Sequence, residues 1–413
     1  MGYVGLPISA TWASRGINVI GVDIDQTIVN SINAGEPHFA EPALDMLLRA
    51  AAQTGTLRAT SEPEPADAFV IAVPTPLRPD RSADLDYVDA ATAAIAPFLT
   101  QGNIVILEST VPVGTTQRLA CRFAKLRPDL RFPMTNGAAD IDVHIAHCPE
   151  RVLPGRTVRE LIEHDRVIGG MTERCAARAE AIYKVFLQGD CFLTDAGTAE
   201  LVKLTENAFR DVNIAFANEL SLICDSLGLN IWRVIDLANR HPRVSVLDPG
   251  AGVGGHCIAV DPWFIVSSAP DRAKLIRTAR EVNDGKPHFV VAQVRERASR
   301  FRNPIVACLG LAYKPDVDDT RESPALKITR ELANAEELER ILVADPNLRE
   351  LPQELGGYSN VAFVPTGDAV QQADIIAVLV AHSAFKKISR EEVLRRVVID
   401  ATGLFQRSEG RNS

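Results

Sequence analysis

The sequence lacks any hydrophobic run of the kind that crosses a membrane. No apolar stretch reaches the roughly 18 residues of a membrane-spanning helix. No basic segment followed by an apolar stretch opens the chain, so we expect no secretory signal. Basic residues are also fewer than acidic ones: 44 against 53, which gives a net charge of −9. This balance argues against nucleic acid or an anionic membrane as the main partner.

The sequence also lacks cysteines and histidines paired at metal-binding spacings. It has seven cysteines, an odd number, which are scattered along the sequence and include no Cys-x-x-Cys motif. Its eight histidines form no His-x-x-x-His or His-Glu-x-x-His pair. A disulfide framework and a zinc site are therefore disfavoured, and we assign no metal ligand. Reduced cysteines indicate a reducing compartment, the cytoplasm.

What is present is typical of a globular enzyme of several domains. At roughly 150 residues per domain, 413 residues predict two or three domains. Hydrophobic residues make up 46% and charged residues 23%, which excludes a disordered, collagen-like or coiled-coil chain.

Continuous apolar runs separated by helical stretches occur at both ends of the chain. Such runs predict parallel strands covered on both faces, and therefore an α/β fold with two doubly wound Rossmann-like domains. The runs are 18–23, 67–73 and 103–107 near the start, and 303–310, 340–345, 373–380 and 396–400 near the end.

Between these two regions, apolar residues recur every three or four positions. This spacing, from Val202 to Leu227, predicts one long amphipathic helix that ends near Gly228. Its apolar stripe could pack within the chain or form a dimer interface, and the sequence alone does not separate the two.

Two glycines at the start of the chain have the spacing of a dinucleotide-binding turn. Gly2 and Gly5 match the last two glycines of Gly-x-Gly-x-x-Gly, and Asp23 follows some twenty residues later at the end of a predicted strand. Such a turn brings backbone close to a pyrophosphate, and the acid binds a ribose hydroxyl, which favours NAD over NADP. The alternative is that Asp23 only forms a turn.

The first glycine and the strand before it are absent from this pattern. We expect that the natural chain starts upstream, that Met1 is an internal methionine, and that the first strand of the N-terminal sheet is missing. Its loss leaves strand edges unpaired, so we expect the 413-residue chain to be poorly stable and to bind NAD weakly.

A second glycine-rich stretch leads into a cysteine. Four of the six residues from Gly250 to Gly255 are glycine, so something must approach this backbone closely. Cys257 follows at once and is interpreted as a reactive thiol, with Asp261 one helical turn further on. The other cysteines singled out are interpreted as inert thiols: Cys121, Cys175, Cys191, Cys224 and Cys308.

Two sets of charged residues suit an anionic substrate. Lys203 and Asn207 lie four residues apart on one face of the long helix, where lysine can lower a thiol pKa or stabilise an oxyanion. Lys314 and Arg321 follow a predicted strand and suit a phosphate. The alternatives are a solvated helix face and a charged surface loop.

Seven motifs in this order resemble the UDP-glucose/GDP-mannose dehydrogenase family over essentially the whole chain. They are Gly2–Pro7, Val73–Pro76, Glu108–Thr110, Cys148–Arg151, the Lys203/Asn207 helix, Gly254–Cys257 and Lys314–Ser323. The resemblance implies an NAD-binding domain over 1–195, a central helical domain with the cysteine loop and a dimerisation face over 196–298, and a UDP-sugar-binding domain over 299–413. It also implies NAD as cofactor, a UDP-amino sugar as substrate, and a homodimer or larger homo-oligomer.

The reaction implied by the resemblance oxidises a sugar C6 alcohol to a carboxylate with two NAD. One hydride transfer makes an aldehyde, the Cys257 thiolate adds to it, a second hydride transfer gives a thioester, and water hydrolyses it. Lys203 and Asn207 hold the oxyanion, while Asp261, Glu150 and Thr110 position water and manage protons.

The resemblance also assigns binding residues. Those implied for the cofactor are Gly2, Tyr3, Val4, Gly5, Asp23, Thr75, Thr110 and Arg321. Those implied for the substrate are Glu150, Arg151, Lys203, Asn207, Arg210, Arg243, Gly254, His256, Tyr313 and Lys314, with Arg243 reaching the substrate of a neighbouring subunit.

Three stretches resemble most the family members that oxidise UDP-N-acetyl-D-mannosamine: Cys148–Gly155, Asn239–Arg243 and Gly254–Trp263. Members acting on UDP-glucose carry a second glutamate where Pro154 stands and usually Lys-Asp where Val260-Asp261 stands, which disfavours UDP-glucose. Pro154 and His256 suggest a pocket for an acetamido sugar. UDP-N-acetylglucosamine, the C2 epimer, stays an alternative substrate, and a non-catalytic nucleotide-sugar-binding protein stays an alternative function.

Overall fold

The computed structural model describes residues 1–39, 41–134, 140–152, 155–255 and 257–406. The chain forms two compact units. The N-terminal unit comprises Met1–Glu206 with Trp263–Ala269, and the C-terminal unit comprises Asn207–Pro262 with Pro270–Ser413. Among the described residues, no helix is both long and apolar enough to span a membrane.

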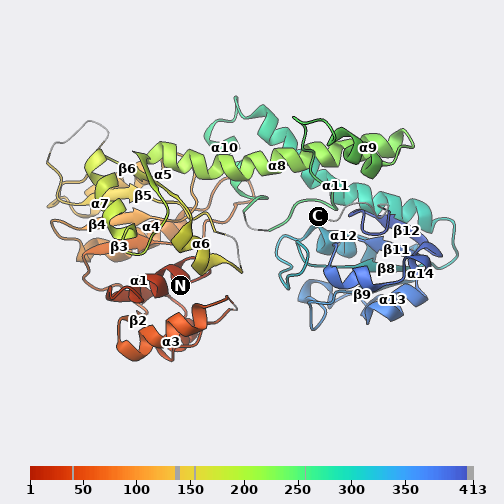
Figure 1. Cartoon of the computed structure of the whole chain (residues 1–413), viewed down its shortest axis with the longest axis horizontal. Helices are drawn as coiled ribbons and strands as arrows, with labels where there is room; N and C mark the ends of the chain where they lie inside the picture. Colours follow the sequence, from red (N-terminus) through yellow and green to blue (C-terminus); the bar gives the residue numbers. More distant parts are fainter. Residues whose placement is uncertain (40, 135–139, 153–154, 256, 407–413) are drawn as a thin grey trace. The chain divides into compact units, whose positions relative to one another are not determined.

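A five-stranded sheet forms the centre of the N-terminal unit (Figure 1). Its order is β3-β4-β5-β6-β7, and every neighbouring pair is parallel except β5 with β6. The strands are β3 (Ala68–Ile71), β4 (Ile104–Leu107), β5 (His144–His147), β6 (Arg166–Gly170) and β7 (Cys191–Asp195). The first two coincide with predicted apolar runs.

Helices cover both faces of this sheet because alternate strand residues point to opposite sides. Val105 and Leu107 of β4 pack with α4 (Asp86–Ile95) and α5 (Thr115–Leu126). Ile104 and Ile106 pack with α1 (Gly5–Ala13) and α7 (Glu173–Tyr183). The remaining short helices here are η1 (Ala96–Phe98) and α6 (Thr157–Glu163). This covered sheet is the predicted α/β arrangement, except that β5 and β6 run antiparallel rather than parallel.

A separate two-stranded parallel sheet joins β1 (Val19–Val22) to β2 (Leu57–Thr60), with α2 (Gln26–Asn33) and α3 (Leu44–Thr54) beside it in the chain. In the described part of the chain, β1 pairs only with β2, and β3 pairs only with β4. The expectation of a further strand before residue 1 stays a prediction.

The predicted long helix is confirmed. Helix α8 (Ala196–Ser226) is a single helix of 31 residues, and Gly228 follows it with a φ of 66°, a left-handed conformation that suits glycine (Figure 1). The helices that follow are α9 (Ile231–Ala238), α10 (Asp261–Ser268) and α11 (Lys274–Ala298).

A second five-stranded sheet forms the rest of the C-terminal unit. Its order is β10-β9-β8-β11-β12, and all pairs are parallel. The strands are β8 (Ile305–Leu309), β9 (Arg340–Ala344), β10 (Val361–Phe363), β11 (Ile375–Val378) and β12 (Val397–Asp400). The helices are α12 (Pro324–Ala333), η2 (Gln353–Leu355), α13 (Thr366–Gln372), η3 (Ser383–Lys387) and α14 (Arg390–Leu394). The second predicted Rossmann-like region is thus confirmed.

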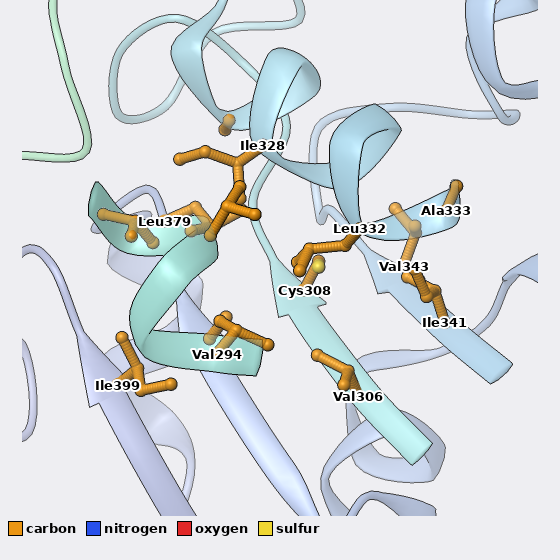
Figure 2. Packing of buried hydrophobic residues seen from close by; sticks show 14 of the residues in the cluster. Val294, Val306, Cys308, Ile328, Leu332, Ala333, Ile341, Val343, Leu379 and Ile399 are labelled. Carbon is orange, nitrogen blue, oxygen red and sulfur yellow. The ribbon is translucent and has the colours of Figure 1, made fainter. Parts of the chain in front are cut away.

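The core of this sheet contains Cys308. Figure 2 shows its sulfur among apolar side chains that include Val306, Ile328 and Leu332. The side chain is fully buried, and burial raises the pKa of the thiol to about 12. Its predicted role as an inert packing residue fits this environment.

Candidate active site

The N-terminal glycine turn leads directly into helix α1. Gly2 and Val4 accept the first backbone hydrogen bonds, from Leu6 (3.1 Å) and Ile8 (3.2 Å). No acidic residue lies in the first turn, and among the described residues no side chain caps this N-terminus. The helix start therefore presents backbone N–H groups and positive dipole without an internal anion, which fits a pyrophosphate.

Asp23 lies next to this turn, one residue beyond strand β1. Its carboxylate contacts the Met1 amino group and accepts a hydrogen bond from the Asp25 amide (2.9 Å). The Tyr3 ring is half exposed and contacts the Phe39 ring in a tilted arrangement, with a centroid separation of 4.3 Å. The structure thus places the Gly2 turn beside Asp23, the two features on which the predicted dinucleotide site depends.

The loops after β3 and β4 are tied to each other. The Thr75 hydroxyl donates to the Thr110 carbonyl (2.7 Å), and Ser109 Oγ bonds both the amide and the carbonyl of Val73. Since parallel strands end at the same edge of a sheet, both threonines lie at the carboxyl edge where Rossmann-like sheets bind ligands.

A buried cluster of side chains around Arg166 includes Glu150, and the role of Arg166 was not predicted from the sequence. Arg166, at the start of β6, reaches Glu108 Oε1 (3.5 Å) and Glu150 Oε2 (3.3 Å) with its two terminal nitrogens. Its guanidinium lies 4.5 Å from the centre of the Tyr183 ring, and the Tyr183 hydroxyl reaches Glu108 Oε1 (3.4 Å). The Arg166 guanidinium thus pairs with two carboxyl groups, and this contact holds the Glu150 side chain in position.

Burial dominates the electrostatics of this group. It raises the pKa of Glu108 to about 8, which the Arg166 charge partly offsets and the Glu150 charge reinforces. Burial likewise raises the pKa of Cys148 to about 12, so this thiol is not a nucleophile at neutral pH. Glu108 therefore titrates near neutral pH beside Glu150.

The segment after Glu150 is held by two further carboxylates. Arg151 forms a two-point ion pair with Glu206 of α8, with nitrogen–oxygen distances of 2.6 and 3.2 Å. Glu41 accepts hydrogen bonds from the backbone N–H groups of Gly155 (2.8 Å) and Thr157 (2.7 Å) at the start of α6. Pro154 lies outside the described residues.

Helix α8 carries Lys203 and Asn207 one turn apart, as predicted. Asn207 donates to Asp261 Oδ2 at 2.5 Å, and Asp261 is almost fully buried. The Cys257 carbonyl accepts from the amide of Asp261 (2.9 Å), so a single helical turn connects the two residues. The predicted neighbourhood of Asp261 with Cys257 and Asn207 is therefore present, with the Cys257 side chain exposed.

The glycine loop is approached by the chain itself. A Cβ on Gly254 would lie 2.5 Å from the Glu322 carbonyl oxygen and 2.7 Å from Pro324, and one on Gly255, whose φ is 83°, would lie 3.0 Å from the Tyr313 ring. The predicted close approach is thus made by the segment that carries Tyr313 and Lys314. His256 lies outside the described residues.

That segment is fixed at several points. Arg321 pairs with Asp319 at 2.6 Å, and the Tyr313 amide donates to the Asp319 carbonyl (2.9 Å). The Asp316 amide donates to Nδ1 of buried His382 (3.0 Å), whose other ring nitrogen lies 3.1 Å from Asp345. Arg210 and Arg243, two other predicted substrate residues, have exposed side chains.

Comparison with known proteins gives the class. Sequence profiles of three domains match in order: the NAD binding domain over residues 1–187, the central domain over 197–285 and the UDP binding domain over 307–407 of the UDP-glucose/GDP-mannose dehydrogenase family. Fold, dinucleotide turn and matches together define an NAD-dependent oxidoreductase. The chain belongs to the UDP-glucose/GDP-mannose dehydrogenase family, as its motifs suggested.

Individual relatives are similar over nearly their whole length. An NDP-N-acetyl-D-galactosaminuronic acid dehydrogenase of Ralstonia nicotianae is 54% identical over 98% of this chain and 95% of its own. A UDP-N-acetyl-D-mannosamine dehydrogenase of Campylobacter jejuni is 55% identical over 95% and 97%. The solved structure of a UDP-D-ManNAc dehydrogenase from Pyrococcus horikoshii has a TM-score of 0.86 at 37% identity, covering 100% of this chain and 95% of that one.

Proposed function

We propose that this chain oxidises UDP-N-acetyl-D-mannosamine at C6 to UDP-N-acetyl-D-mannosaminuronate, using two NAD and a covalent Cys257 intermediate. The observation that carries the proposal is the Asn207–Asp261 hydrogen bond beside the Cys257 turn. It joins a polar group on α8 to a buried carboxylate one turn from an exposed thiol. The C. jejuni and P. horikoshii relatives support the choice of sugar.

The proposed chemistry balances over four electrons. Bound NAD would supply the hydride acceptor for C6 in each of two oxidations. After the first, Cys257 adds as thiolate to the aldehyde carbon, and the C–S bond holds the substrate as a hemithioacetal. The second oxidation leaves a thioester, and water cleaves its C–S bond to give the carboxylate and return the thiol. Lys203 and Asn207 stabilise the negative oxygen at C6 in both additions.

The acidic residues carry out the proton transfers. Asp261, held by Asn207, accepts the proton of the C6 hydroxyl or of the attacking water. Glu150, held by Arg166, positions that water together with Thr110. Substrate and cofactor would be held by the residues assigned from the sequence, over an NAD-binding region 1–195, a central region 196–298 and a UDP-sugar-binding region 299–413.

A second sugar is supported by one finding. The R. nicotianae relative, named for N-acetyl-D-galactosaminuronic acid, is as similar to this chain as the mannosamine enzymes are. UDP-N-acetylgalactosamine, together with UDP-N-acetylglucosamine, is therefore the proper competitor in a substrate test.

We also propose that the enzyme is a homodimer that works in the cytoplasm. Phe209, Phe216 and Ile223 recur every seven residues on α8, and between 46% and 71% of each is exposed. Seven residues make nearly two turns, so these side chains form one apolar stripe on the helix. A second copy of α8 would cover it and bring Arg243 of a neighbour toward the substrate.

The test is the rate of NADH formation with purified enzyme and each UDP-sugar. We expect the highest kcat/KM for UDP-N-acetyl-D-mannosamine, with UDP-glucose lower by at least about 100-fold, because an unfilled acetamido pocket leaves polar groups unpaired. Cys257→Ala should form no acid. Cys121→Ala, at a half-buried thiol on α5, is the matched control and should be active. A preference for the galactosamine or glucose sugar would overturn the proposed substrate.

A further inference from the structure

Asn218 lies in the middle of α8 and is completely buried. Its side-chain oxygen accepts a hydrogen bond from the Gly250 amide at 2.9 Å, and Gly250 is the first residue of the glycine loop that leads to Cys257. Its side-chain nitrogen donates to Asn283 Oδ1 of α11 at 2.8 Å. Asn218 thus connects the loop to two helices.

The orientation of the Asn218 amide is set by a buried ion pair. Asp211 accepts from Arg280 Nη1 at 2.6 Å and also from Asn283 Nδ2 at 2.8 Å. A carboxylate only accepts, so the NH2 group of Asn283 must face Asp211, and its oxygen must face Asn218. The Asn218 NH2 group is then committed to Asn283, and its oxygen is left facing Gly250.

The network consists of four buried side chains and ends at the exposed Asp284, to which Arg280 also donates. Asp211, Asn218, Arg280 and Asn283 are each at most 1% exposed. Buried polar groups bonded to one another in this way rigidify their surroundings, because breaking one bond leaves its partner without water. The Gly250 amide is therefore hydrogen-bonded to a rigid part of the structure.

Helix α8 also binds the cysteine segment at a residue that follows Cys257. Asn207 binds Asp261, four residues beyond the thiol, and Asn207 precedes Asn218 by eleven residues. Eleven residues turn a helix through about 1,100°, within about 20° of three full turns, so the two asparagines lie on one face. The segment from Gly250 to Asp261 is thus bound to α8 before and after its thiol.

We propose that Asn218 is a positioning residue for Cys257: it fixes the entry of the glycine loop on α8, so that the thiol is presented to C6 in one geometry. Asn218 touches no reacting atom in this proposal. The inference rests on the proposed covalent role of Cys257.

The test compares Asn218→Ala, Asn218→Asp and Asn213→Ala. Alanine removes the acceptor for Gly250, whereas aspartic acid keeps it, and in the protonated form that burial favours it also keeps a donor for Asn283 Oδ1. Asn213, on the same helix, donates to the Phe209 carbonyl of its own helix at 2.7 Å and is the matched control. We expect Asn218→Ala to lower kcat by about 10- to 100-fold, since misplacement of a reacting group by about 1 Å has that effect. The KM for NAD should change by less than about twofold, and Asn218→Asp should recover most of kcat.

The second readout is the rate at which iodoacetamide alkylates each cysteine, followed by peptide mass spectrometry. A released loop should make Cys257 react faster by about threefold or more, while buried Cys308 stays unreactive. General loosening of the fold would speed both, and that result would overturn the proposal. So would a folded Asn218→Ala enzyme with wild-type kcat and wild-type Cys257 reactivity. If Asn218→Ala is too unstable to assay, an Asn218→Asp enzyme with wild-type kcat supports the proposal, and one as impaired as Cys257→Ala contradicts it.

These outcomes are separable from a failure of the proposed chemistry. If Cys257→Ala still forms acid at the wild-type rate, the covalent mechanism is wrong. If Cys257→Ala is inactive but Asn218→Ala is unaffected in both readouts, only the positioning role is wrong.

Discussion

The single positive charge of Arg166 lies beside the carboxyl groups of Glu108 and Glu150. All three side chains are buried away from water. Two ionised carboxylates beside one buried guanidinium leave an uncompensated charge, which is unfavourable in a low-dielectric interior. Burial raises the pKa of Glu108, and the Glu150 charge adds to this effect, because protonating Glu108 removes the excess charge. Glu150 then keeps Arg166 as an ionic partner.

Replacing Glu108 with glutamine tests this charge balance. Burial raises the Glu108 pKa from 4.5 to about 8, so between these values the folded state holds a proton that the unfolded state has lost. The associated stability is fully present below about pH 4.5 and is lost as the pH rises toward 8. We expect the Tm of the wild type to fall between about pH 6 and pH 8 relative to Glu108→Gln. Parallel Tm profiles in calorimetry would refute this assignment.

Asp261→Asn separates the chemistry of this residue from its structural contact. The asparagine can still accept from Asn207, so we expect Tm to change by only a few degrees. Loss of the carboxylate should lower acid formation by about 100-fold or more, because proton transfer at C6 loses its base. Steady-state NADH production and thermal unfolding measure the two effects. Equal activity of both enzymes would remove Asp261 from proton transfer.

The residues named from the sequence and those found only in the structure differ in kind. Cys257, Asp261, Lys203 and Asn207 are close in the chain or follow a helical spacing, so their proximity in pairs can be predicted. Arg166 and Asn218 act through contacts with residues 16 to 65 positions away. Such contacts depend on which strands pair and which helices pack, and no local spacing encodes them.

At the scale of elements, helix α8 stabilises the start of helix α5. Glu200 of α8 is buried and accepts three hydrogen bonds: from the Gly114 amide (2.6 Å), the Thr116 amide (2.7 Å) and the Thr116 hydroxyl (2.6 Å). A helix N-terminus has unpaired N–H groups and a positive dipole end, and a carboxylate satisfies both. This contact also fixes the loop that carries Thr110.

Removing the Glu200 cap should destabilise the chain. We expect Glu200→Ala to lower the free energy of unfolding by about 2–3 kcal/mol, because buried N–H groups lose a charged acceptor. Urea titration followed by circular dichroism measures the change. Glu219→Ala, at an exposed position of the same helix, is the control and should change it by less than about 0.5 kcal/mol. A Glu200→Ala chain as stable as the control would show that the cap is dispensable.

The strands divide into those that the sequence predicts and those that it does not. Strands β3, β4, β8, β9, β11 and β12 coincide with predicted apolar runs, because both faces of their sheets are covered. Strand β7 escaped prediction because all five of its residues are exposed or half-exposed, so it forms no buried apolar run. Strand β6 begins with Arg166, whose burial depends on partners that lie elsewhere in the chain.

At the scale of the whole molecule, the proposed homodimer would cover the apolar stripe on α8 with a second copy of the chain. Phe209, Phe216 and Ile223 expose a stripe of large apolar side chains on α8 that is costly in water. We expect Phe216→Glu to raise the dimer dissociation constant by about 100-fold or more, because it buries a charge at the centre of the interface. Light scattering over a concentration series measures this. Met46→Glu, at an exposed methionine of α3, is the control. A wild-type chain that is monomeric at all concentrations would contradict the dimer.

In the proposed mechanism, Cys257 retains the aldehyde until a second oxidation makes the acid. The ratio of NADH formed to UDP-sugar acid formed tests this when a limiting amount of UDP-N-acetyl-D-mannosamine is converted completely. We predict two NADH per acid for the wild type, with no aldehyde released, and no acid from Cys257→Ala. One NADH per sugar with free aldehyde as the product, or two NADH per acid from the alanine enzyme, would contradict it.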